Sequence, residues 1–190
     1  MKYLEEVSRV MRKTEAISGG AIRRMTDRIR VCAEGGGTVY IIGNGGSLTT
    51  AEHFALDLLK YAGVKRARSL GSAATITAIA NDEAFAFAFS STMVAAGLCA
   101  DDLLVAFTFS GQSRNVREAL EVAQRADADC ILITGPEEPS RKIQVRLATV
   151  AICVPSDNIR IVEDVHLAIA HCIAQGSREA AGRSSDPKEE

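Results

Sequence analysis

The stretch TVYIIGNGGSLTTAEHFALDL, residues 38–58, joins a short apolar run to a glycine-rich turn and then to a helical pattern. The run at 38–43 is nearly continuous in β-branched and aliphatic residues, which is typical of a strand buried on both faces of a parallel sheet. Similar runs that end in Gly, Ser or Pro recur at 102–110, 129–135 and 149–155, and a fifth strand is expected near 67–70. The sequence therefore predicts a parallel sheet.

Helical patterns alternate with these runs, at 48–62, at 75–97 with a break near Asn81–Asp82, at 113–127 and at 158–175. Strand, turn and helix in repeated order indicate βαβ units and hence a doubly wound α/β fold. A further helix is predicted at 3–33, where Gly19–Gly20 should break or bend it. We expect a single domain over residues 1–176 and a disordered polar tail over 177–190.

The composition narrows the class of protein. The 190 residues have a hydrophobic share of 47% and a net charge of −2, so nothing biases the chain toward nucleic acid or membranes. The amino terminus lacks the apolar core of a signal peptide, and no apolar run is long enough to span a membrane. We therefore expect a cytoplasmic protein with no nucleic-acid or membrane partner. The five cysteines form no CxxC motif and are expected to be buried free thiols.

The loop IIGNGGS, residues 41–47, follows the first strand. Ligands of parallel sheets bind at the carboxyl ends of the strands, where helix N-termini offer free N–H groups to anions. Glycines let the backbone approach a ligand, and Asn44 and Ser47 offer hydrogen bonds or could cap the following helix. The loop is neither a Walker loop nor a GxGxxG turn, so nucleotide binding is not indicated. Turn and cap chemistry alone would also explain it.

A second loop, TFSGQSRN at residues 108–115, follows another strand. Ser110 and Ser113 lie close to Gly111 where the strand gives way to a helix, which is the composition of an anion-binding nest. The loop lacks the lysine of a nucleotide motif, so a phosphate or phosphosugar suits it better than ATP. Two such loops at neighbouring strand ends favour a ligand site over two ordinary turns.

All three histidines lie on two of the predicted helices. His53 and Asp57 are four residues apart, so they share one helix face and could bind one metal ion or proton, although such pairs are often structural. The last helix carries four further ionisable residues, Glu163, Asp164, His166 and His171. Glu163 and His171 would complete a ligand set suited to zinc or another divalent ion. Asp164 is an alternative to Glu163, because it lies nearly on the same face as His171.

Four stretches together resemble the sugar isomerase (SIS) domain family, and within it the phosphoheptose isomerases. They are GNGGSLTTAEHFALDL, AIANDEAF, FTFSGQSRNVREAL and VEDVHLAIAH, and the resemblance runs in order from about residue 4 to 175. It implies a flavodoxin-like three-layer α/β/α sandwich with a central parallel sheet and an extra N-terminal helix. It also implies a homotetramer with active sites at subunit interfaces, and the interconversion of sedoheptulose 7-phosphate and D-glycero-D-manno-heptose 7-phosphate.

By this resemblance, the family's site residues carry over to positions of this chain. The substrate-binding positions are Asn44, Gly45, Gly46, Ser47, Asn81, Asp82, Thr108, Phe109, Ser110 and Ser113, together with Asp57 and Glu163. The two metal-binding histidines fall on His53 and His171, and His171 is also the family's catalytic acid/base. Asp57 stands where the family has a glutamate that is both ligand and base, and Glu163 stands where it has a glutamine ligand.

Three positions depart from the family's pattern. Asp57 is one methylene shorter than glutamate, which draws the base back by roughly 1.5 Å and can reduce the rate severely. Glu163 adds a negative charge, which would tighten metal binding and weaken the metal as a Lewis acid. Phe109 replaces a threonine and removes one hydroxyl from the phosphate loop. We expect a relative of the heptose enzymes whose substrate can differ from theirs.

The favoured hypothesis is a phosphosugar aldose–ketose isomerase that works through an enediol. Asp57 would be the base and His171 its acid partner, with zinc on His53, Asp57, Glu163 and His171 to polarise the carbonyl. The alternative is a non-catalytic SIS protein, either a phosphosugar-binding regulator or a tetrameric adaptor of the replication-initiation type. That adaptor branch lacks the full metal set, so the presence of both His53 and His171 favours the enzyme.

Overall fold

In the computed structural model of this chain, residues 2–136 and 142–182 are described. Five parallel strands form one sheet in the order β2-β1-β3-β4-β5. Their bounds are Val39–Ile42 for β1, Ala67–Ser69 for β2, Leu103–Thr108 for β3, Asp129–Thr134 for β4 and Val150–Cys153 for β5. All five strands predicted from the apolar runs are confirmed, the short one near 67–70 included.

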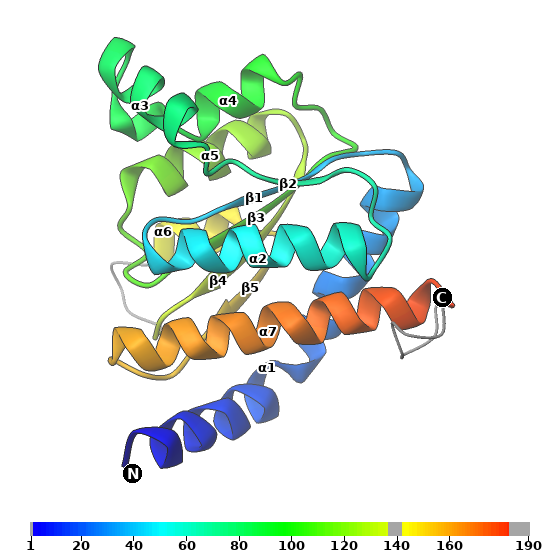
Figure 1. Cartoon of the computed structure of the whole chain (residues 1–190), viewed down its shortest axis with the longest axis vertical. Coiled ribbons are helices and arrows are strands. Elements are labelled where there is room, and N and C mark those ends of the chain that lie inside the picture. Colours follow the sequence, from blue (N-terminus) through cyan, green and yellow to red (C-terminus); the bar gives the residue numbers. More distant parts are fainter. Residues whose placement is uncertain (1, 137–141, 183–190) are drawn as a thin grey trace.

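Helices cover both faces of the sheet (Figure 1). One face carries α1 (Lys2–Glu34), α2 (Gly46–Lys60) and α7 (Ile159–Ala180). The other carries α3 (Ala73–Asp82), the short 3-10 turn η1 (Phe85–Phe87), α4 (Ser90–Ala95), α5 (Arg114–Arg125) and α6 (Lys142–Leu147). The expected three-layer α/β/α sandwich with an extra N-terminal helix is confirmed.

The strands are apolar on both sides because each face of the sheet has its own core. Ile41 of β1, paired in register with Val105 of β3, packs in the core under α1, α2 and α7. The next pair in register, Ile42 and Ala106, packs in the opposite core with α5. This alternation explains why the runs read as continuous rather than as period-two patterns.

The sheet order places a crevice between β1 and β3. These two strands are neighbours, yet the helix that follows β1 lies on one face and the helix that follows β3 lies on the other. The two loops therefore diverge at the carboxyl edge, which is where open α/β sheets bind ligands. Both loops singled out in the sequence lie at this edge.

Several helix boundaries differ from those predicted. Helix α1 stays continuous through Gly19–Gly20, and Figure 1 shows it changing direction along its length, so the bend is observed and the break is not. The helix predicted at 75–97 is interrupted after Asp82, as expected, and then continues as η1 and α4. Helix α6 was not predicted, because its six residues are too few to show a helical period.

The carboxyl-terminal boundary predicted at residue 176 is too early. Helix α7 runs on to Ala180, and the buried Ser177 hydroxyl donates to the carbonyl of Ile173 at 2.8 Å. Ser177 is therefore part of the packed domain, whereas residues 183–190 of the expected tail lie outside the described residues. Within the described ranges, none of the helices is both long and apolar enough to cross a membrane.

The cysteines are free, as predicted, but they are not all buried. Cys32 and Cys130 are buried, Cys153 is half-buried, and Cys99 and Cys172 are exposed. Burial raises the pKa of the Cys32 and Cys130 thiols to about 12. These two thiols are therefore inert core residues, and the prediction of burial is wrong for the two exposed ones.

Candidate active site

A reciprocal pair of amide hydrogen bonds joins the loop after β1 to the start of α5. Asn44 Nδ2 donates to Asn115 Oδ1, and Asn115 Nδ2 donates to Asn44 Oδ1, each at 2.9 Å. Asn115 is 2% exposed, and its Oδ1 also accepts from the Val116 N–H at 3.0 Å. Asn115 was not predicted as a site residue, although an amide in the first turn of the helix after a serine loop was the available signal.

The backbone conformation after β1 requires glycine at two positions. Gly45 has φ 57° and ψ −124°, a left-handed conformation that residues with a Cβ rarely adopt. A methyl group on Gly43 would collide with the backbone of Ser47, because the chain folds back tightly into α2. Helix α2 has no side-chain cap, so the suggested capping role of Asn44 and Ser47 is wrong.

A hollow of about 220 Å³ lies between the two loops and the start of α7. Its lining residues are Asn44, Ser47, Phe107, Thr108, Phe109, Ser110, Ser113, Ile159 and Glu163. Seven of these nine were predicted as substrate-binding positions. The described lining offers amide and hydroxyl groups, the Glu163 carboxylate and no basic side chain, so attraction for an anion would have to come from the N-terminal N–H groups of α2 and α5.

The pair Asn81 and Asp82 does not reach this hollow. Both residues are exposed at the end of α3, where Asn81 Nδ2 donates to Asp82 Oδ1 at 2.8 Å. Neither belongs to the lining of the hollow. Within the single chain, the pair Asn81 and Asp82, which was predicted to contact substrate, is therefore separate from the loops that line the hollow.

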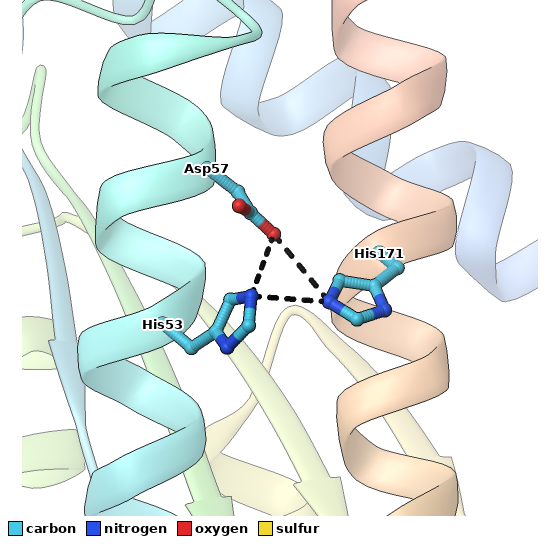
Figure 2. A group of neighbouring side chains, drawn as sticks. All are labelled: His53, Asp57 and His171. Atoms are coloured by element: carbon cyan, nitrogen blue, oxygen red, sulfur yellow. Dashed lines mark hydrogen bonds and ion pairs between the residues drawn. The ribbon is translucent and has the colours of Figure 1, made fainter.

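Helices α2 and α7 run side by side in the same direction and bring together three ionisable side chains (Figures 1 and 2). Figure 2 shows His53 and Asp57 reaching from α2 toward His171 on α7. Asp57 Oδ2 lies 3.7 Å from His53 Nε2 and 3.6 Å from His171 Nε2, and the two Nε2 atoms are 3.3 Å apart. The carboxylate is buried, whereas both imidazoles are about half exposed. We call this group the triad.

The triad has the shape of a metal site. A point equidistant from the three ligand atoms, in their plane, lies about 2 Å from each, given their separations. That is the usual distance from zinc to histidine nitrogen or carboxylate oxygen, and two histidines with one carboxylate form a known catalytic zinc set. The predicted residues His53, Asp57 and His171 therefore fit a divalent ion with one position left open.

The structure does not bring Glu163 to the triad. In the described part of the chain, the residues whose ligand atoms lie within 4.8 Å of one another are His53, Asp57 and His171 alone. The Glu163 carboxylate lies against Gly46 instead, at the hollow. The alternative ligand Asp164 is also separate, because it is exposed and accepts a hydrogen bond from the Tyr3 hydroxyl at 2.6 Å.

His166 is a core residue rather than a site residue. It is fully buried, with its ring 5.8 Å from that of Phe107. Burial lowers the pKa of His166 to about 4, because the charged imidazolium would be removed from water. His166 is therefore neutral at physiological pH and contributes packing beneath the hollow.

A second cavity, of about 380 Å³, adjoins the triad. It is lined by Asp57, Tyr61, His171, Ala174, Gln175, Arg178 and Glu179. Tyr61 and Gln175 were not predicted as site residues, although each lies four residues after a triad member and therefore on the same helix face. The triad thus lies between a hollow at the start of the two helices and a cavity nearer their ends.

Comparison with known proteins now identifies the family. The sequence profile of the SIS domain matches residues 2–135. The phosphoheptose isomerase of Dechloromonas aromatica (strain RCB) is 33% identical over 161 residues, which cover 82% of this chain and 80% of that protein.

Two solved structures agree with this match. A phosphoheptose isomerase from Neisseria gonorrhoeae superposes with a TM-score of 0.85 at 28% identity, covering 94% of this chain and 96% of the other. A phosphoheptose isomerase from Francisella tularensis superposes with a TM-score of 0.84 at 32% identity, covering 94% and 95%. On these matches and on its own architecture, the chain belongs to the SIS domain family.

Proposed function

We propose that this chain is a phosphoheptose isomerase, an aldose–ketose isomerase that interconverts sedoheptulose 7-phosphate and D-glycero-D-manno-heptose 7-phosphate. The observation that carries the proposal is the placement of an anion-type hollow and an acid–base triad on the same two helices. The likeness to proteins named phosphoheptose isomerases supports the same reaction.

The spacing of the two regions suits a phosphorylated sugar. Ser47 lines the hollow and His53 lies six residues further along α2, a rise of roughly 9 Å at 1.5 Å per residue. An extended sugar phosphate can span this distance with its phosphate in the hollow and its carbonyl end at the triad. Binding both ends of the sugar phosphate would fix its reacting carbons beside the proposed base. Such positioning can supply a large part of the rate enhancement.

Asp57 is proposed as the base that removes the proton from the carbon next to the carbonyl. Its Oδ2 faces the two imidazoles, so its Oδ1 is the oxygen left to accept the proton. His171 is proposed to move protons between the substrate's oxygens; because its Nε2 is also the atom that faces the position of a divalent ion, this role requires that Nε2 be free of the ion. The proton then returns to the neighbouring carbon and completes the isomerisation.

His53, Asp57 and His171 are the residues that would hold a divalent ion, and zinc fits them best. When bound, such an ion supplies Lewis-acid polarisation of the carbonyl and stabilises the enediolate charge. Glu163 was expected as a fourth ligand, but its carboxylate would first have to leave Gly46. We therefore propose three protein ligands, with the fourth position for substrate or water.

The homotetramer and the cytoplasmic location stay predictions. Large apolar side chains exposed on α1 and α2 support assembly, since such surface is usually covered by a partner. They include Leu4 at 62% exposed, Ile17 at 61%, Leu56 at 56% and Leu59 at 44%. Sedimentation equilibrium would test the tetramer directly.

The proposal is tested by the metal content of the purified protein and by turnover of sedoheptulose 7-phosphate. We expect bound zinc and turnover in the wild type. His171→Ala should lose metal and reduce kcat/KM by at least a thousandfold, because a ligand and the acid are removed together. Cys172→Ser, the next residue on α7 and exposed, is the matched control and should retain both properties.

Two outcomes would contradict the proposal. Metal-free wild-type protein that turns over no phosphosugar would favour the regulator or adaptor instead. Equal turnover by the wild type and His171→Ala would show that His171 is not the acid, even if the reaction is correct.

A further inference from the structure

Glu163 is the one charged residue among the described residues that line the 220 Å³ hollow. Its side chain is half-buried, and no hydrogen bond or ion pair joins it to another described residue. A partly desolvated carboxylate without a protein partner is unfavourable, so natural proteins rarely retain one without a use. The hollow therefore contains a charge that no hydrogen bond or ion pair within the described part of the chain neutralises.

The position of this carboxylate is set by Gly46. Any side chain at residue 46 would collide with both carboxylate oxygens, so the absence of a Cβ there makes room for them. The carboxylate lies over the first residue of α2, where the positive end of the helix dipole favours a negative charge. Glu163 is thus held in place while its oxygens stay open to a ligand.

A carboxylate is the wrong group for holding phosphate alone. It only accepts hydrogen bonds, and it repels a phosphate dianion bound among the neutral donors of the same hollow. Sugar hydroxyls, in contrast, donate to carboxylates in strong charge-assisted hydrogen bonds. The side chain therefore favours a ligand that presents hydroxyls next to its phosphate.

From this we infer that Glu163 is a specificity-determining residue that accepts hydrogen bonds from substrate hydroxyls beside the phosphate. Its carboxylate lowers the affinity of the hollow for free phosphate and raises its affinity for a polyhydroxylated phosphate ester. The hollow thereby discriminates sugar phosphates from the inorganic phosphate that surrounds them. This inference rests on the proposed function, because it assigns the hollow to the substrate's phosphate end.

Calorimetric titration of the full-length protein with two ligands, inorganic phosphate and sedoheptulose 7-phosphate, tests the inference. Glu163→Gln keeps the size of the side chain and removes its charge. We expect this variant to bind inorganic phosphate about tenfold more tightly, because the repulsion is gone. It should bind sedoheptulose 7-phosphate no more tightly than the wild type, so the preference for the sugar phosphate falls at least tenfold.

Two further variants distinguish the effect of the Glu163 charge from the effect of the position of its carboxylate. Glu163→Asp keeps the charge but withdraws the carboxylate by roughly 1.5 Å, so inorganic phosphate should bind as in the wild type while the sugar phosphate binds more weakly. Asp164→Asn removes the same charge from the next residue of α7, which is exposed and outside the hollow. This control should change neither affinity.

The inference is overturned if Glu163→Gln strengthens binding of both ligands equally, since the carboxylate would then only repel. It is also overturned if neither affinity changes, or if Glu163→Gln loses metal that the wild type holds, which would make Glu163 a metal ligand. Wild-type protein that binds phosphate but not sedoheptulose 7-phosphate would contradict both the inference and the substrate assignment. The expected change in preference without turnover would contradict the isomerase function alone.

Discussion

The hollow and the triad share helices α2 and α7, yet they are built in different ways. The hollow is assembled from two strand-end loops and the start of α7, and the Asn44–Asn115 pair joins the first loop to the helix after the second. The triad needs only three side chains on two helices. Single substitutions in the hollow should therefore reduce ligand affinity only gradually, because many groups contribute to it. A single substitution in the triad should abolish most of its activity, because it has only three ligand atoms.

The largest effect is expected from Asp57→Asn in the triad. The change keeps the shape of the side chain and removes the proposed base, so kcat should fall by about 10²–10⁴. Affinity for inorganic phosphate should stay the same, because the hollow is intact. Steady-state kinetics and phosphate titration of the same preparation measure the two regions separately. A parallel loss of phosphate affinity would show that the hollow and the triad are not independent.

A smaller and graded effect is expected from Asn115→Ala in the hollow. The variant removes both amide hydrogen bonds to Asn44 and leaves that amide partly unpaired, at a cost of about 1–3 kcal/mol in the free energy of unfolding. KM should rise roughly tenfold while kcat changes little, since the proposed base Asp57 and the proposed acid His171 are untouched. Urea denaturation and initial rates provide the two measurements.

Gln124→Ala, on the exposed side of α5, is the matched control for that experiment. It should leave stability and KM close to wild type. A loss of kcat in Asn115→Ala as large as that in Asp57→Asn would contradict the contrast between the two regions.

The smallest effect on activity is expected from His166→Leu, whose effect on stability should depend on pH. The native pKa of His166 is lowered to about 4 from its usual 6.5, so the unfolded chain binds the proton more readily between these values. The neutral histidine's contribution to stability is therefore complete above pH 6.5 and is lost as the pH falls toward 4. At pH 5 the loss in the wild type should be about 2 kcal/mol.

His166→Leu should remove this loss and flatten the dependence of stability on pH over that interval. Urea denaturation of both proteins at pH 7.5 and pH 5 makes the comparison. Neither kcat nor phosphate affinity should change at pH 7.5, because His166 lies beneath both regions without lining either. An unchanged pH dependence would mean that the imidazole is protonated in the folded chain.

The sequence predicted those features that depend on neighbours along the chain. Apolar runs located the five strands, and strand-end composition located the two loops of the hollow. The pair His53 and Asp57 followed from a spacing of four residues. Each of these predictions uses only local geometry, which the residue pattern records directly.

Features that depend on packing between distant segments were predicted less well. Asn115 was missed because its partner Asn44 is 71 residues away. Glu163 was expected at the triad, but its place is set by the absence of a side chain on Gly46, on a different helix. His166 and His171 look alike in sequence, and only the direction that each faces on α7 separates a core residue from a site residue.

The contact between His53 and His171 joins residues 118 positions apart, which has a consequence for the order of folding. During synthesis the chain emerges from its amino terminus, so the strands and loops that make most of the hollow are complete before α7 exists. The triad forms only when the last helix docks beside α2. The triad, and the chemistry proposed for it, is therefore the last part of the site that the chain acquires, and a chain cut short before α7 has the two loops of the hollow without His171.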